Sequence, residues 1–341
     1  MRKQIMCLII GAVIGVFLVT SPAFSKMTIK LAHIDPPNRL KTNMHSFACS
    51  FKDFVENHSR GEMEVQIYPA GQLGGMREMV ESTKLGVVHT VITFTAIANV
   101  FCPEFGIIQT PYMFPTAKHA WYVVDGWLGR ELAEEFEKKT NMKLLAYGEA
   151  GGYHQLFTNK REIHNPGDLK GFRLRVPMNK GLFRFFEALG AKPVSIPWNE
   201  VYTAMETGTA DGLDGTVNTV VDSKLYETFK YTTLTTHFYG TSEFLINDAF
   251  FQSLSKEQKR IITQGAKIAA VVSRGTSRNN DGLSLGVLRS KGIKVYIPTE
   301  DEISQFAKFN SAYLGYMEET VGKEWVDKLL RAAKEAHEAL D

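Results

Sequence analysis

The sequence predicts an α/β fold of two lobes whose last third is mainly helical. Short apolar or alternating runs of strand length interleave with amphipathic runs of helical length along the chain. This alternation restarts near residue 142, beside a group of glycines. The chain of 341 residues is also longer than one hydrophobic core usually supports, so we expect two domains.

Residues 1–25 have the layout of a secretory signal peptide. An Arg-Lys pair opens the chain, residues 6–19 are apolar, and Pro22 precedes a small-residue pattern that ends at Ser25. The alternative is a membrane anchor, but this apolar run is shorter than the ~20 residues that a spanning helix needs, and no second long apolar segment follows. We therefore expect cleavage after Ser25 and a periplasmic location.

The charge balance argues against several classes of partner. The chain has 39 basic and 37 acidic side chains, and loss of Arg2 and Lys3 with the signal peptide leaves 37 of each. A balanced chain offers no large basic face, so we expect neither nucleic acid nor acidic lipid as a partner.

Two cysteines, Cys49 and Cys102, follow the signal peptide. An oxidising compartment permits a disulfide, but the separation of the two residues in sequence does not reveal their distance in space. Both have apolar neighbours, which favours two small buried hydrophobic side chains.

The first part of the sequence predicts alternating strands and helices. We expect strands at residues 27–33, 62–68 and 87–94, and helices at residues 42–57 and 76–85. This order is typical of a mostly parallel sheet.

The pattern restarts in the second part of the sequence. We expect strands at residues 142–147, 153–158 and 171–176, and helices at residues 180–189 and 198–207. Gly148, Gly151 and Gly152 separate the first two of these strands, which indicates a hinge between two lobes. Two lobes that pack rigidly against each other would give the same pattern.

Capping-box patterns mark the helices of the last third. Ser255 with Gln258 precedes a helix that we expect to end near Arg289, and Thr299 with Glu302 precedes another. From these elements we expect lobe I to comprise residues 26–151 plus about 238–280, and lobe II residues 152–237 plus about 281–341.

Short enzyme signatures are missing from the sequence. It has no phosphate loop, no Gly-x-Gly-x-x-Gly, no His-Glu-x-x-His and no Cys-x-x-Cys, and its nine histidines are scattered without ligand spacing. Many enzymes lack short signatures, so this absence weakens an enzymatic interpretation without excluding it. We expect no catalytic residue, no cofactor and no metal.

One stretch carries most of the functional information. Residues 168–177 have the sequence Asp-Leu-Lys-Gly-Phe-Arg-Leu-Arg-Val-Pro. Further characteristic pieces stand at residues 68–74, 110–114, 188–193, 197–205, 209–212, 224–227 and 235–237. In order and spacing, these pieces resemble the solute receptors of TRAP (tripartite ATP-independent periplasmic) transporters of the C4-dicarboxylate-receptor type. The resemblance covers essentially the whole chain after residue 25.

The resemblance implies a two-lobed periplasmic binding protein fold, with mixed, mostly parallel sheets flanked by helices and with long C-terminal helices. It also implies a receptor that captures a small organic anion between its lobes and delivers it to an integral-membrane TRAP permease without catalysis. We expect this receptor to be a monomer.

Arg173 and Arg175 alternate with apolar residues, so both side chains leave one face of a strand. Most arginines are exposed or salt-bridged, and this is the alternative for each. Arg175 stands near the strand end, where α/β folds place ligands. The resemblance implies that Arg175 forms a bidentate salt bridge with a substrate carboxylate, for which its planar guanidinium is suited. Arg173 aligns with a position that is usually lysine, and we expect a structural role for it.

The resemblance suggests further ligand-binding residues. Trp198 falls where the family places an aromatic side chain over the ligand, with core packing as an equal alternative. His33 aligns with a polar pocket position, with a satisfied core histidine as the alternative. Asp214 is the better pocket candidate of two nearby aspartates, because Asp211 is expected to cap a turn.

Departures from the family pattern bear on specificity. Many members carry a second arginine where this chain has His154, and an asparagine where it has Gly215. The stretch at residues 93–97, which includes Phe94, lacks the charged residues of the sialic-acid branch. We expect His154, Gly215 and Phe94 in the pocket. These differences argue against sialic acid, weaken the case for a dicarboxylate, and favour a small monoanion such as a short keto or hydroxy acid, an aromatic acid or a sulfonate.

Other functions stay open at this point. The chain could serve an ATP-driven (ABC) importer or a chemoreceptor instead of a TRAP permease. It could also be a periplasmic enzyme that acts on organic acids, with His154 or His33 as the base. A purely structural periplasmic protein is the third alternative. The sequence leaves the identity of the anion undetermined.

Overall fold

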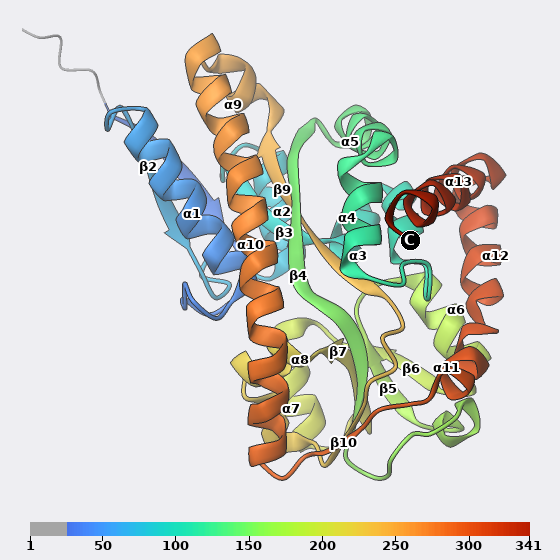
Figure 1. The fold of residues 1–341 in the computed structure, drawn as a ribbon. Helices are drawn as coiled ribbons and strands as arrows, with labels where there is room; N and C mark the ends of the chain where they lie inside the picture. The colour runs from blue at the N-terminus through green and yellow to red at the C-terminus, as the bar shows by residue number, and fades with distance from the viewer. Residues whose placement is uncertain (1–25) are drawn as a thin grey trace, which may run out of the picture.

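The computed structural model describes residues 26–341 (Figure 1). The predicted signal peptide, residues 1–25, lies outside the described residues. Within residues 26–341, no helix combines the length and apolar character that crossing a membrane requires.

The first part of the chain forms a parallel sheet. β1 (Met27–Ala32) pairs in parallel with β2 (Met63–Tyr68) on one side and with β3 (Thr90–Phe94) on the other. α1 (Asn43–His58) and α2 (Met76–Lys84) connect these strands. The predicted strand at residues 87–94 starts only at Thr90, because the chain turns at Gly86, whose φ is 77°. This order of elements confirms the α/β prediction.

The middle of the molecule is built around β4 (Met142–Thr158), which is one strand where the sequence predicts two. Gly151 and Gly152 have positive φ angles within β4, and the pairing register shifts between Glu149 and Gly152. A bulge therefore bends the strand without breaking it. β4 pairs antiparallel with β9 (Tyr239–Asn247) along its first part, and with β7 (Gly212–Thr216) and β8 (Tyr231–Thr233) along its end.

The second part of the chain adds further parallel strands. β5 (Arg173–Val176) pairs in parallel with β6 (Lys192–Ser195) and with β7, and β10 (Lys294–Tyr296) pairs in parallel with β8. The main path of the sheet runs in the order β2-β1-β3-β9-β4-β7-β5-β6, with β3 antiparallel to β9. The sheet is therefore mixed. Its first part comprises β1, β2, β3, β9 and the start of β4, and its second part comprises the end of β4 with β5, β6, β7, β8 and β10.

Helices cover both parts of this sheet. The remaining elements of the first half are α3 (Thr95–Phe101), η1 (Pro103–Gln109), α4 (Ala117–Asp125) and α5 (Trp127–Thr140). Those of the second half are η2 (Pro166–Leu169), α6 (Lys180–Ala188), η3 (Trp198–Glu200), α7 (Val201–Glu206), α8 (Val217–Asp222), η4 (Leu225–Thr228) and α9 (Asp248–Ser253). The predicted helix at residues 198–207 is thus a short 3-10 turn followed by an α-helix.

Long helices form the C-terminal third, as predicted. α10 (Lys256–Ser290) runs along the molecule and packs against α1, β4 and α8 (Figure 1). The capping box at its start is present, because the Ser255 hydroxyl accepts from the Gln258 amide at 3.2 Å. α11 (Glu300–Ala307) carries the second predicted capping box, with Thr299 and Glu302.

The last two helices return across the molecule. α12 (Asn310–Val321) packs against α6 and η1, and α13 (Lys323–Leu340) packs against α4, α5 and η1. The C-terminal helices therefore contact elements of both predicted lobes. The division of the chain into these lobes stays a prediction.

The buried apolar residues form two clusters. The larger surrounds the first part of the sheet and extends to α6, α12 and α13. The smaller lies in the second part, around Phe157, Val201, Leu213 and Leu288. Cys102 is fully buried, Cys49 is half-buried, and both are free thiols.

Candidate ligand-binding site

A cavity lies between the two parts of the sheet. The first part contributes Ile34, Asp35, Asn43, Met44, Phe94, Thr95, Ala96, Gln109, Ala150, Gly240 and Thr241. The second part contributes His154, Arg175, Pro177, Trp198, Asp214, Gly215, Thr216 and Thr219. Six of the seven predicted ligand-binding residues therefore line one cavity, and His33 does not.

Arg175 is a buried cation without a protein carboxylate. Only 5% of the residue is exposed, and its Nε donates to the Ile196 carbonyl at 3.1 Å. Among the described residues, Arg175 forms no ion pair within 4.0 Å, in contrast to its strand neighbour Arg173. Burial lowers the pKa of Arg175 to about 10, and the charge of Asp214 opposes this shift. The guanidinium is therefore charged at neutral pH and has two Nη groups available for an anion.

Trp198 lies beside this guanidinium. It starts η3, directly after Ile196 and Pro197, and the centre of the guanidinium lies 5.5 Å from the centroid of the indole ring. This distance is in the range of a cation–π interaction. The side chain is half-buried and lines the cavity, so it does not belong to the fully buried core.

Arg173 and Asp211 form a separate ion pair outside the cavity. Nη2 of Arg173 lies 2.7 Å from Oδ1 of Asp211, and Nε lies 3.1 Å from Oδ2. Lys160 also contacts Asp211, at 2.7 Å. These two cations and the backbone amide of Arg173 hold the pKa of Asp211 well below its usual range, although burial acts in the opposite direction. Arg173 is thus held by Asp211 and does not line the cavity, which agrees with the structural role expected for it.

Asp214 is held between two histidines. Its Oδ1 lies 2.7 Å from Nδ1 of His154 and 2.9 Å from Nε2 of His237. Burial alone would raise the pKa of Asp214, but the two histidines outweigh burial and hold this pKa well below its usual range. Its Oδ2 is buried and has no hydrogen-bond partner. The wall of the cavity therefore carries a buried anion, and one of its two oxygens has no protein partner.

His237 contacts the cavity-lining Asp214, and sequence reasoning did not single it out. The sequence places it only within the pattern at residues 235–237, without a role. The structure brings it to Asp214 because the chain segment before β9 runs beside β4. Its Nδ1 is 2.8 Å from the Thr235 hydroxyl, and burial lowers its pKa. The sequence around it offers only a Thr-x-His pattern before a strand, which a turn would also explain.

His33 belongs to the interior and not to the cavity, contrary to its predicted position. The residue is fully buried, and its Nε2 lies 3.1 Å from Nδ1 of His45. Burial, with a smaller contribution from His45, lowers the pKa of His33 to about 3, so the ring is neutral. The chain leaves β1 at this point, and the next two residues, Ile34 and Asp35, line the cavity instead.

Several polar lining residues were not predicted. Asp35 accepts from the Met44 amide at 2.9 Å, and burial raises its pKa to about 6. Thr216 caps α8, with its hydroxyl 3.3 Å from the Thr219 amide. Asn43, Gln109 and Thr241 add uncharged hydrogen-bonding groups to this lining. Such a lining suits a ligand that carries hydroxyl groups.

Comparison with known proteins identifies relatives over almost the whole described chain. The family model described as "Bacterial extracellular solute-binding protein, family 7" matches residues 32–320. The 2,3-diketo-L-gulonate-binding periplasmic protein YiaO of Escherichia coli K12 is 28% identical over 256 residues, which cover 74% of this chain and 76% of that protein.

Two solved structures show the same fold with different acids. The sugar acid binding protein DctPAm of Advenella mimigardefordensis, in complex with galactonate, has a TM-score of 0.86 and 29% identity, and the match covers 91% of this chain and 98% of that one. A TRAP periplasmic solute binding protein of Sulfurospirillum deleyianum, with bound succinate, has a TM-score of 0.83 and 27% identity, with 89% and 98% covered.

Proposed function

Because the chain belongs to family 7 of the bacterial extracellular solute-binding proteins, we propose that it is the periplasmic receptor of a TRAP transporter and binds a hydroxylated monocarboxylate. The observation that carries this proposal is the guanidinium of Arg175, which is buried and has no carboxylate partner among the described residues. A buried charge without a countercharge is unfavourable, and a ligand carboxylate supplies both the charge and two parallel acceptors.

The charge of the cavity favours one carboxylate over two. Asp214 already places a negative charge at the cavity wall, and His154 and His237 hold that charge in place. A second ligand carboxylate near Asp214 would meet a like charge, whereas a ligand hydroxyl can donate to its unpartnered Oδ2. This preference agrees with the sequence-based expectation of a monoanion and narrows it to a hydroxy acid.

The relatives support both this proposal and its main alternative. The Advenella protein binds galactonate, a polyhydroxylated monocarboxylate, and the Sulfurospirillum protein binds succinate, a C4-dicarboxylate. The second candidate function is therefore a dicarboxylate receptor. The position of Asp214 favours the hydroxy acid.

The mechanism is capture by closure. The carboxylate pairs with Arg175, Trp198 lies over the guanidinium, and the polar lining binds the hydroxyl groups. Exclusion of water from the closed cleft strengthens the ion pair. The ligand favours the closed form only to the extent that it binds this form more tightly. The loaded receptor then delivers the acid to the membrane permease, and no bond of the acid is broken, since the relatives are receptors and not enzymes.

A calorimetric panel tests this function. Residues 26–341, freed of any co-purified ligand, are titrated with galactonate, succinate, benzoate and ethanesulfonate, and with galactitol as the uncharged polyol control. We expect galactonate to bind more tightly than succinate and galactitol not to bind. Binding of succinate alone would establish the dicarboxylate receptor. Binding of galactitol would show that the protein does not require a carboxylate on its ligand.

A further inference from the structure

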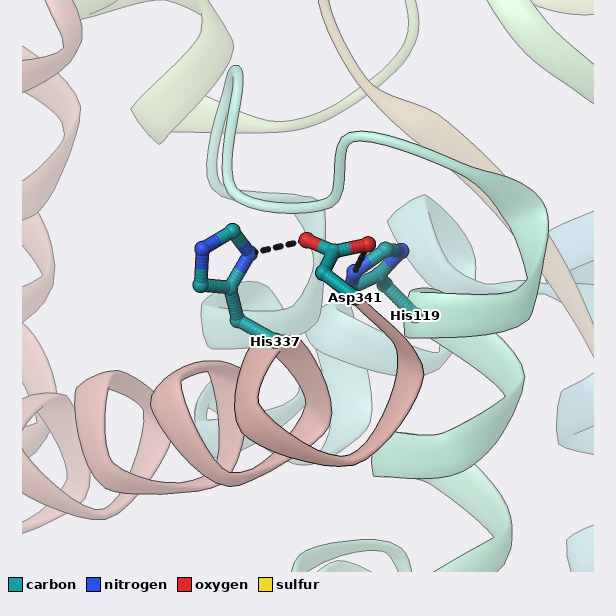
Figure 2. Close-up of side chains that lie close together, drawn as sticks. All are labelled: His119, His337 and Asp341. Carbon is teal, nitrogen blue, oxygen red and sulfur yellow. Dashed lines mark ion pairs between the residues drawn. The ribbon is translucent and has the colours of Figure 1, made fainter.

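A cluster of metal-ligating side chains lies where the end of α13 meets α4 (Figure 2). His119 comes from α4, and His337 and Asp341 stand four residues apart at the end of α13. Figure 2 shows the Asp341 carboxylate between the two imidazole rings. One ligand atom of each residue lies within 4.8 Å of those of the other two. None of the three residues lines the ligand cavity.

His119 points a buried nitrogen without a partner into this cluster. The residue is 3% exposed, and its Nε2 is among the buried polar atoms that have no hydrogen-bond partner. The nearest acid oxygen is Oδ1 of Asp341 at 3.6 Å, which is too long for a hydrogen bond. Burial of an unpaired polar atom is unfavourable. A bound ion that contacts this nitrogen would therefore supply the partner that the fold does not provide.

The other ring nitrogen of His119 is held in place. Its Nδ1 lies 2.8 Å from the hydroxyl of Thr116, the residue that precedes α4. Metal-binding histidines commonly use one ring nitrogen for the ion and donate from the other to a neighbouring oxygen, which orients the ring. Thr116 supplies such an oxygen and leaves Nε2 free to face Asp341.

We propose that His119, His337 and Asp341 bind a divalent transition-metal ion, best matched by Zn²⁺, which fastens the end of α13 to α4. Two imidazole nitrogens and one carboxylate oxygen are a common zinc ligand set, with water in the fourth position. Bonds of ~2.0–2.2 Å in a tetrahedron place neighbouring donor atoms roughly 3.3–3.6 Å apart. The 3.6 Å between His119 and Asp341 fits this spacing. Ca²⁺ and Mg²⁺ fit less well because they prefer oxygen ligands.

Binding requires one small rearrangement. Nδ1 of His337 now lies 2.5 Å from Oδ2 of Asp341, and this ion-pair contact would be replaced by bonds from both groups to the metal. His337 and Asp341 are 66% and 50% exposed, so both can move and the site can be reached from solvent. The buried His119 would then form the fixed inner ligand.

The position of the site suggests what the metal does. α13 already contacts α5 through Lys328 and Glu131 at 3.0 Å, and Trp127 donates to Glu335 at 2.7 Å. These contacts lie before the last turn of α13. A metal at His337 and Asp341 would hold this last turn against α4 and so stabilise the helices that link both parts of the molecule.

The test is zinc binding to residues 26–341 without a polyhistidine tag and with no residue added after Asp341. After chelator treatment, isothermal titration with Zn²⁺ should give one equivalent per chain. We expect His337→Ala and Asp341→Asn each to weaken zinc binding at least about 10-fold, because loss of a direct ligand costs no less than loss of a residue that only orients one. Because both side chains are half-exposed or more, these variants should fold, and circular dichroism checks this.

His164→Ala is the matched control. His164 is a partly exposed histidine 3.2 Å from an acid, Glu162, but belongs to no group of three ligands among the described residues. It should bind zinc like the unaltered protein. Zn²⁺ should also slow amide hydrogen exchange at the end of α13, and His337→Ala should abolish this effect.

Three results would overturn the proposal. The first is absence of zinc binding at micromolar concentration. The second is binding that His337→Ala leaves unchanged. The third is binding that is lost in His154→Ala, because His154, Asp214 and His237 are the other group of three potential ligands among the described residues. The first two results would leave the proposed anion receptor untouched, whereas the third would place zinc at the wall of the ligand cavity, on His154 and Asp214.

Discussion

Nδ1 of His154 lies 2.7 Å from Oδ1 of Asp214, across the antiparallel strands β4 and β7. His237 contacts the same oxygen from a third segment. Asp214 is the acid whose charge acts on Arg175, yet it forms no ion pair with that guanidinium. Two histidines therefore hold the acid, and the Nη groups of Arg175 form no ion pair with a described residue. This separation of charges within one cavity underlies the first two predictions.

Arg175→Ala should weaken binding of the preferred acid by about 10- to 100-fold. The variant loses a charged hydrogen-bonding partner, which is worth ~1.5–3 kcal/mol, and a factor of ten corresponds to about 1.4 kcal/mol. Isothermal titration measures the change. Arg173→Ala, two residues earlier on β5, is the control, because Arg173 pairs with Asp211 outside the cavity. Unchanged affinity in Arg175→Ala would contradict the assigned role.

Asp214→Asn should shift specificity toward dicarboxylates. The variant removes a buried negative charge from the cavity wall, so the repulsion of a second ligand carboxylate falls, while a ligand hydroxyl loses a charged acceptor. The ratio of galactonate to succinate affinity should therefore decrease. The same titrations on Asp211→Asn should leave the ratio unchanged, because Asp211 faces Arg173 and Lys160. An increased ratio in Asp214→Asn would argue against the proposed ligand class.

Glu243→Gln should stabilise the ligand-free protein increasingly as the pH rises. Glu243 is fully buried in β9; its Oε1 accepts from Thr95 at 2.6 Å, and Oε2 has no partner. Burial raises its pKa to about 8, against the opposing hydrogen bonds of Thr95 and Thr241. The folded state thus keeps a proton that the unfolded chain releases above its usual pKa of 4.5. The free energy of unfolding therefore falls between pH 4.5 and 8.

Glutamine keeps the shape of the protonated acid and has no proton to lose. The variant should match the unaltered protein near pH 4.5 and gain roughly 2–5 kcal/mol over it above pH 8. Urea unfolding at pH 4.5, 7 and 9 provides the measurement. A difference that does not change with pH would show that Glu243 does not titrate in this range.

Much of the fold was predictable because its elements are marked by local sequence patterns. The strand at β1, the helices α1 and α6, and both capping boxes lie within a residue or two of the predicted positions. The prediction failed at β4, where glycines were interpreted as a break between two strands. β9 pairs with β4 before and after the bulge, at Glu149 and at Gly152, and β9 is distant from the bulge in the sequence.

The candidate site was predicted to a similar extent. Arg175 stands at a strand end before Val-Pro, and this position together with the family resemblance predicted its place at the cavity. His33 also stands at a strand end, but the chain turns there and directs it to His45 in the interior. His237 has no local signal that separates it from a turn residue. The position of His33 depends on His45 in α1, and that of His237 depends on Asp214 in β7.

The sequence by itself determined the order of strands and helices, the helix caps and the family, because these follow from periodicity and motifs over short distances. Only the tertiary structure decided how the charges are paired. Asp211 and Asp214 are three residues apart, yet one neutralises Arg173 while the other is held by His154 and His237. His119 and His337 likewise meet only because α13 returns to α4. Charge pairing acts over a few ångströms in space, and that proximity is set by packing between distant segments.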